Sequence, residues 1–207
     1  ACNMSKVTIA GDVNGTGVFT IAAPNGNTNR TLVLPDEDGT IITTTSLPSL
    51  PNPLTSGTAV ATTSGTAIDL TGIPSWAKRV TVLIAGVKQN NSGGNPFKFR
   101  LGTSGGIVSS GYVGSAGYFG GGPASVSASN GFDISFDTNT WVYSGSLVLT
   151  NVSGNVWVGA GTFGQNQGYQ FIACAYIDLG AALTQVRFTT TNGTNTFTAG
   201  SINIMYE

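Results

Sequence analysis

The chain has 207 residues, only 8% of them charged, and a formal net charge of −1. An average protein has about 25% charged residues. The eight scattered Lys and Arg residues therefore provide no surface for nucleic acid, and no apolar run reaches the roughly 18 residues of a membrane-spanning helix. The chain contains no His, which excludes Ser-His-Asp and Cys-His catalysis and histidine metal sites.

Residues 1–45 contain four short apolar segments, each about four residues long and separated from the next by turn residues. These predicted strands are residues 6–9, 18–21, 31–34 and 40–43. Strands this short cannot build a stable core in a monomer. The low net charge also gives little protection against association. We therefore expect an N-terminal β-hairpin module that forms a homotrimer and acts as an attachment point or shaft.

Residues 46–57 form a predicted linker. Pro48, Pro51 and Pro53 favour an extended, semi-rigid connection and not a strand within a sheet. A proline-rich binding motif is the functional alternative, and the composition favours the spacer.

Residues 58–207 predict about ten strands punctuated by Gly and Asn. Ala67 begins a short alternating strand that Pro74 terminates, and Trp76 follows as a bulky anchor. Residues 79–87 are apolar and β-branched, which predicts a long central strand. The spacing indicates an all-β fold: an antiparallel β-sandwich of jelly-roll type.

Three finer expectations concern particular residues of this domain. Residues 97–101 alternate, with Phe97 directed inward and Lys98 outward. Cys174 lies in an apolar run and is predicted to be a core thiol. Asn192 and Gly193 predict a tight hairpin between the last two strands.

Three stretches resemble parts of bacteriophage tail-fibre and other virion-attached proteins. Residues 65–87 resemble a segment of the C-terminal domains of such proteins, and residues 197–207 resemble their chain ends. Residues 16–41 are similar to the short repeat with which many phage fibres begin. The resemblance covers roughly a third of the chain. It implies a virion protein whose N-terminal module binds other tail or virion proteins.

Carboxylates are the main chemical groups left for catalysis or metal binding. Asp133 and Asp137 lie four residues apart and could flank a glycosidic bond, but Asp137 also fits an ordinary turn. Asp36, Glu37 and Asp38 could hold Ca²⁺, but a solvated turn before Gly39 is the favoured explanation. We therefore expect no enzyme activity, no cofactor and no metal.

Two segments combine aromatic or amide side chains with Gly. The stretch 111–123 is predicted to be a long irregular loop, and the second candidate is 163–169. Aromatic faces and amides suit sugar C–H groups and hydroxyls. The residues predicted to contact a host receptor are Tyr112, Tyr118, Phe119, Gln165, Asn166, Gln167 and Tyr169. Packing against a neighbouring subunit explains the same composition as well.

These observations predict a non-enzymatic phage virion protein, a trimeric tail fibre whose distal sandwich binds a host surface glycan or protein. One alternative is a purely structural virion subunit, such as a head-decoration or baseplate protein. A polysaccharide depolymerase is the other.

Overall fold

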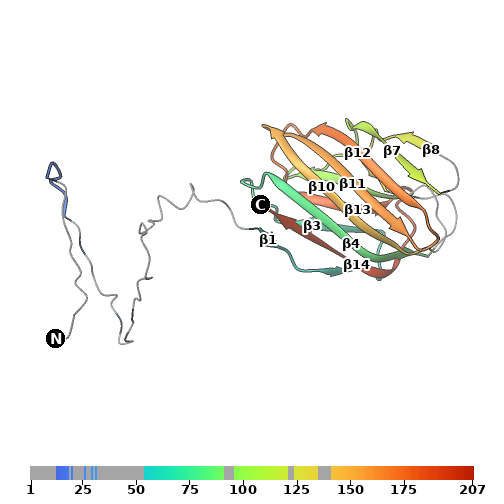
Figure 1. Ribbon diagram of the computed structural model, residues 1–207, viewed down its shortest axis with the longest axis horizontal. Coiled ribbons are helices and arrows are strands. Elements are labelled where there is room, and N and C mark those ends of the chain that lie inside the picture. Colours follow the sequence, from blue (N-terminus) through green and yellow to red (C-terminus); the bar gives the residue numbers. More distant parts are fainter. Residues whose placement is uncertain are drawn as a thin grey trace, which may run out of the picture. The chain divides into compact units, whose positions relative to one another are not determined.

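The computed structural model describes residues 13–18, 20, 26, 29, 31, 54–90, 96–120, 124–134 and 141–207. The chain divides into two compact units, Ala1–Thr43 and Thr44–Glu207. The described residues contain strands and turns, and there is no helix among them (Figure 1). Most residues of the strands predicted in 1–45 and most of the predicted linker lie outside the described residues. The end of that linker, Thr55–Ser56, is a strand.

Two antiparallel sheets form the second unit, which confirms the predicted all-β fold. Figure 1 shows the strands of the larger sheet side by side, from β14 to β8. In spatial order this sheet contains β1 (Thr55–Ser56), β14 (Phe197–Tyr206), β4 (Arg79–Gln89), β10 (Tyr143–Ser153), β11 (Val156–Gln165), β12 (Gln170–Asp178), β7 (Val113–Phe119) and β8 (Ala124–Ser127), while β2 (Val60–Ala61) also pairs with β14. The smaller sheet contains β3 (Ala67–Thr71), β13 (Gln185–Thr190), β5 (Phe97–Thr103) and β6 (Gly106–Ile107), while β9 (Phe132–Asp133) also pairs with β5.

The strand pairs are nested along the chain. β1 pairs with β14, β3 with β13, β4 with β10 and β5 with β9, and successive pairs alternate between the two sheets. This is the connectivity of a jelly roll, in which a long antiparallel ribbon is rolled into a sandwich. The predicted central strand is β4, which lies between β14 and β10.

Four further strands extend the larger sheet beyond this nested set. β7 and β8 come from the chain between β5 and β9, and β11 and β12 come from the chain between β10 and β13. They continue the sheet from β10 in the order β11, β12, β7 and β8. The extension therefore brings two distant stretches of sequence together.

Aromatic rings fill the space between the two sheets. The centroid of the Phe97 ring lies 5.4 Å from that of Tyr143, 5.3 Å from that of Phe188 and 5.9 Å from that of Phe197. All four rings are buried. Burial of such a side chain stabilises the fold by about 2–3 kcal/mol. The inward orientation predicted for Phe97 is confirmed.

Cys174 lies outside this core, so its prediction as a core thiol is wrong. Strand β12 alternates strictly between buried and exposed residues. Phe171, Ala173, Ala175 and Ile177 face the core, and Cys174 is exposed on the opposite face. The apolar run concealed this alternation because alanine occupies two of the inward positions.

The hairpin predicted at Asn192 and Gly193 is also wrong. β13 and β14 belong to different sheets, so these residues belong to a connection between the sheets. Gly193 has a φ of 66°. The Oδ1 of Asn192 accepts hydrogen bonds from the backbone N–H groups of Thr194 and Asn195. Such side-chain-stabilised turns use the same residues as hairpins.

Trp76, expected to be an anchor of the core or of a subunit interface, is a surface residue of the single chain and does not anchor its core. It is 40% exposed, and its ring meets the edge of Tyr206 at a centroid distance of 5.7 Å. The residues between β3 and β4 turn at the end of the sandwich, so Trp76 covers this end instead of entering the core.

The Gly-rich stretch 111–123 is not the irregular loop that its composition predicts, because residues 113–119 form β7, paired on both sides. Gly114 permits the close approach of β7 to β12. A Cβ at this position would lie 2.1 Å from the carbonyl oxygen of Cys174. The glycine is therefore required by packing within a sheet.

We predict that Gly114→Ala lowers the free energy of unfolding by about 2 kcal/mol or more, because the neighbouring backbone must move. Gly164→Ala is the matched control, since a Cβ there meets nothing within 4 Å. Urea unfolding of both variants tests this. Equal stability of the two would show that β7 does not approach β12 so closely.

Candidate functional site

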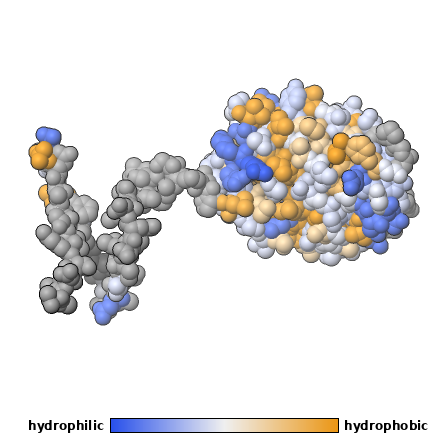
Figure 2. Space-filling model, viewed as in Figure 1, coloured by the Kyte–Doolittle hydropathy of each residue, from blue (hydrophilic) through white to orange (hydrophobic). Residues whose placement is uncertain are grey.

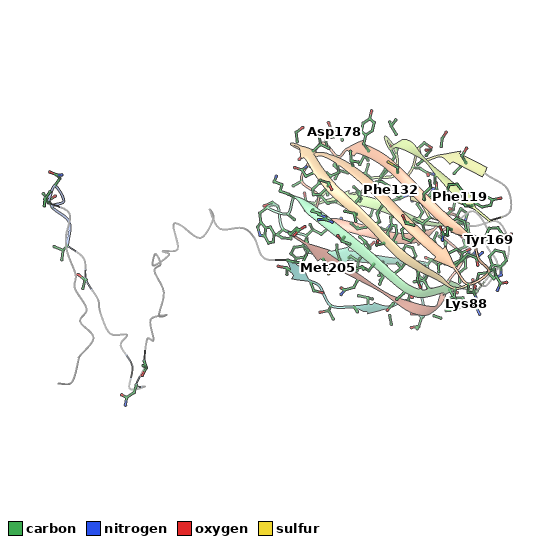
Figure 3. The ribbon with its side chains drawn as sticks, viewed as in Figure 1. Lys88, Phe119, Phe132, Tyr169, Asp178 and Met205 are labelled. Atoms are coloured by element: carbon green, nitrogen blue, oxygen red, sulfur yellow. The ribbon has the colours of Figure 1, made fainter. Side chains whose placement is uncertain are left out.

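The two segments predicted to contact a receptor lie side by side at one corner of the larger sheet. β7 pairs with β12, and the register places Tyr118 opposite Phe171 and Phe119 opposite Gln170. The turn between β11 and β12 therefore lies next to the end of β7. Figure 3 shows Phe119 and Tyr169 near one another at this end of the sandwich.

Four aromatic side chains form what we call the aromatic corner: Tyr118, Phe119, Trp141 and Tyr169. The rings of Trp141 and Tyr169 are stacked, with centroids 5.9 Å apart and an interplanar angle of 14°. Tyr118 lies 6.0 Å from Tyr169 and is half-buried. Phe119 is 58% exposed. The corner thus has a packed base and one exposed ring.

The turn from β11 to β12 places three amide side chains beside these rings. The Oε1 of Gln165 accepts a hydrogen bond from the backbone N–H of Gln167. The Oδ1 of Asn166 accepts one from the backbone N–H of Val142, while the backbone N–H of Asn166 donates to the Val142 carbonyl. These bonds fix the turn and hold residue 142, next to Trp141, against it.

The Nε2 of Gln165 is buried and has no hydrogen-bond partner within the described part of the chain. Such donors are uncommon in native proteins, and each costs about 1–3 kcal/mol. Because this N–H group is buried, a ligand at the surface does not reach it, and Gln165 supports the turn from inside.

Tyr112 does not belong to this corner, although the sequence analysis grouped it with Tyr118. It is 3% exposed. Its hydroxyl accepts a hydrogen bond from the backbone N–H of Leu101 at 2.7 Å and donates one to the carbonyl of Val108 at 3.1 Å. Burial raises the pKa of Tyr112 to about 12. Tyr112 is therefore a core residue that cannot contact a receptor in this structure.

Trp141 was not among the predicted contact residues, because an isolated Trp is more often a core or interface anchor. The residue lies just before β10, and β10 pairs with β11. That pairing brings Trp141 to the turn between β11 and β12. Trp141 is recognised as part of the aromatic corner only because strand pairing brings it close to Tyr169 and the amide residues. These residues are far apart in the sequence.

Asp133 has a different environment from the one expected for a catalytic acid. Its carboxylate lies 3.2 Å from the Nζ of Lys98, and both side chains are buried. Burial raises the pKa of Asp133, and the charge of Lys98 opposes this effect. Lys98 was predicted to point toward solvent, but Asn130 and Gly131 pack against its side chain. Asp137 lies outside the described residues.

A cavity of about 280 Å³ adjoins this ion pair. Val126, Ser127, Asn130 and Thr191 are among its lining residues. Lys98 also donates a hydrogen bond to Asn130, and the backbone carbonyl of Asn130 accepts one from the Nε of Arg100. The charged groups are thus paired with one another, and the arrangement is that of a structural ion pair.

Other candidate chemistry is limited in the described part of the chain. No group of three or more His, Cys, Asp or Glu side chains there is arranged to hold a metal ion. Residues 36–38, considered for Ca²⁺, lie outside that part. Among the described residues, no helix is long and apolar enough to cross a membrane.

The fold and the corner together define an all-β jelly-roll sandwich with an aromatic and amide-bearing surface at one end. Comparison with known proteins identifies no relative: no protein-family model matches the chain, and no curated protein matches it.

We predict that Tyr112→Phe lowers the free energy of unfolding by about 1–3 kcal/mol, because it leaves the buried N–H of Leu101 without an acceptor. Burial raises the pKa of Tyr112 in the folded state above its ordinary value of 10.0. The stability that this group confers is therefore present below pH 10 and lost as the pH rises toward 12. Between pH 9 and pH 11, the free energy of unfolding measured in urea should fall by about 1 kcal/mol in the wild type and by less in Tyr112→Phe. Equal losses would contradict the buried hydroxyl.

We also predict that Asp133→Asn destabilises the fold by about 3 kcal/mol or more, because it leaves the Lys98 ammonium buried without a counter-charge. The double variant Lys98→Met, Asp133→Asn should recover part of this loss. Thermal unfolding of both variants tests the pair, and a neutral Asp133→Asn would show that Lys98 reaches solvent.

Proposed function

We propose that this chain is a non-enzymatic structural protein of a bacteriophage virion: a homotrimeric tail fibre whose β-sandwich contacts the host cell surface. The resemblance of residues 16–41, 65–87 and 197–207 to phage fibre proteins supports the class of protein. In this proposal the N-terminal module binds other tail or virion proteins, and the sandwich carries the aromatic corner to the host.

The aromatic corner is the observation that carries the receptor contact. Phe119 is exposed beside Tyr169, and the exposed residues Asn166 and Gln167 lie on the turn that presents Tyr169. Sugar rings offer C–H groups to aromatic faces and hydroxyls to amides. A host surface glycan is therefore the ligand class that the corner suits best. Each stacked ring contributes about 1 kcal/mol, so useful affinity requires several copies acting together.

A second candidate, a structural virion subunit without a receptor, is favoured by one specific observation. Trp141, Tyr169 and Tyr118 contact one another, so packing within the subunit already accounts for three of the four rings. Only Phe119 remains largely exposed. The two candidates differ in the expected effect of removing the Phe119 ring: the first predicts a loss of host-cell binding, and the second predicts none.

We predict that Phe119→Ala abolishes most binding to host cells while the melting temperature changes by less than about 2 °C, because an exposed ring adds little to stability. Trp76→Ala is the control, since Trp76 is also an exposed aromatic residue, 40% exposed, in the turn between β3 and β4. It should leave binding unchanged. Flow cytometry with labelled protein measures binding, and calorimetry measures stability.

Tyr118→Ala is informative for a different reason. Tyr118 packs on Phe171 at a centroid distance of 5.9 Å, so its removal should lower stability as well as binding. If Phe119→Ala binds host cells as the wild type does, the receptor contact is wrong and the structural candidate replaces it.

A further inference from the structure

The outer face of the larger sheet carries almost no charge. Six of its strands, β14, β4, β10, β11, β12 and β7, contain only three charged residues, Arg79, Lys88 and Asp178. Each lies at or next to the end of its strand. Figure 3 labels Lys88 and Asp178 at the margins of the sheet. In the same view, Figure 2 shows orange and pale residues over the middle of the sandwich and most blue residues toward its ends.

The strand register aligns the outward side chains in rows across the sheet. One row runs through Met205, Thr81, Val148, Ala160, Cys174 and Ser115. The next runs through Asn203, Leu83, Ser146, Thr162, Ile172 and Gly117. We call the surface that carries these two rows, together with the row of Thr150, Val158 and Tyr176 beside them, the uncharged face. The row on the other side, which contains Gln170 and Phe119, lies outside it.

Several apolar residues on the uncharged face are unusually open to solvent. Leu83 is 36% exposed, Val158 37%, Ile172 45% and Tyr176 48%. They come from three different strands, so they cover a broad surface and are not one isolated cluster. Exposed apolar side chains on a surface without charges are typical of a protein–protein contact.

The smaller sheet has the opposite character. Arg187 makes a bidentate ion pair with Asp69 on the neighbouring strand, with both contacts at 2.7 Å. Arg100 lies opposite Arg187 in the register of β5 with β13. One side of the sandwich thus carries a charged row typical of a solvated surface, and the other does not.

We propose that the uncharged face packs against a second copy of this chain. Its size fits such a contact: six strands about 4.8 Å apart and three rows about 6.8 Å apart cover roughly 500–600 Å². The smallest stable interfaces bury about 600 Å² per partner.

A copy of the same chain suits the uncharged face better than a charged partner does. Without charges in the central rows, the three copies of this face in a trimer can meet around its axis with no like-charge repulsion and no unpaired buried ion. The ion pair between Arg79 and Glu207, at 3.1 Å, lies at the margin. The interface rests on the proposed homo-oligomer, but it does not depend on the proposed receptor contact.

Cys174 provides a direct probe, because it is exposed near the middle of the uncharged face in the single chain. The experiment uses the full-length protein with Cys2→Ser, so that Cys174 is the only thiol. Light scattering measures the mass of the oligomer. The rate at which Cys174 reacts with Ellman's reagent is measured in the native protein and in the chain unfolded by urea. In the native oligomer we expect Cys174 to react at least about tenfold more slowly than in the unfolded chain, since reaction then requires the interface to open.

Val158→Lys, and independently Ile172→Lys, should restore fast reaction of Cys174 by placing a charge inside the contact. Val60→Lys is the matched control, because Val60 is a strand valine of similar exposure, 40% against 37% for Val158, and lies on β2 outside the uncharged face. It should leave Cys174 protected.

Three results would overturn the interface: a monomeric wild type, fast reaction of Cys174 in the wild-type oligomer, or slow reaction that persists in both lysine variants. Host-cell binding measured on the wild-type sample separates this proposal from the function above. A protected Cys174 without host binding refutes only the receptor contact. Host binding with an unprotected Cys174 refutes only the interface.

Discussion

The pairing of β7 with β12 is the contact on which the surface features of this protein depend. It attaches β7 and β8 to the edge of a jelly roll that would otherwise end after β10, β11 and β12. The pairing requires Gly114, whose missing side chain lets the two backbones approach. It places Phe119 beside the β11–β12 turn and so assembles the aromatic corner. It also widens the outer face of the larger sheet to a size at which one subunit can cover another.

Charge is distributed unequally between the two sheets, and this difference has a physical consequence for assembly. The smaller sheet holds its charges in pairs, partly exposed for Asp69 and Arg187 and buried for Lys98 and Asp133. The larger sheet has charges only toward its strand ends. An uncharged β-surface loses little solvation when it is covered, whereas a charged one loses much. The sandwich therefore has one side suited to solvent and one suited to protein, while the aromatic corner lies at an end where a ligand can reach it.

The candidate site could be predicted only in part. The aromatic and amide composition around Tyr118 and Gln165 is visible in the sequence, and the structure brings these two segments together. The sequence did not show that Tyr112 faces inward, since a tyrosine in a Gly-rich stretch looks the same whether its hydroxyl meets solvent or the N–H of Leu101. Trp141 was missed for a related reason. Its relation to Tyr169 depends on strands β10, β11 and β12 lying in register.

The sequence by itself determined the all-β class, the long central strand and the inward direction of Phe97, because β-branched composition and period-two alternation are local properties of a strand. The tertiary structure alone decided which faces are covered. Cys174 is exposed because β12 presents it outward, and Lys98 is buried because Asn130 and Gly131 pack against it. Residues 191–196 cross between sheets because β13 and β14 pair with different partners. Each outcome depends on which strand lies next to which, and nonlocal pairing leaves no periodic pattern in a single sequence.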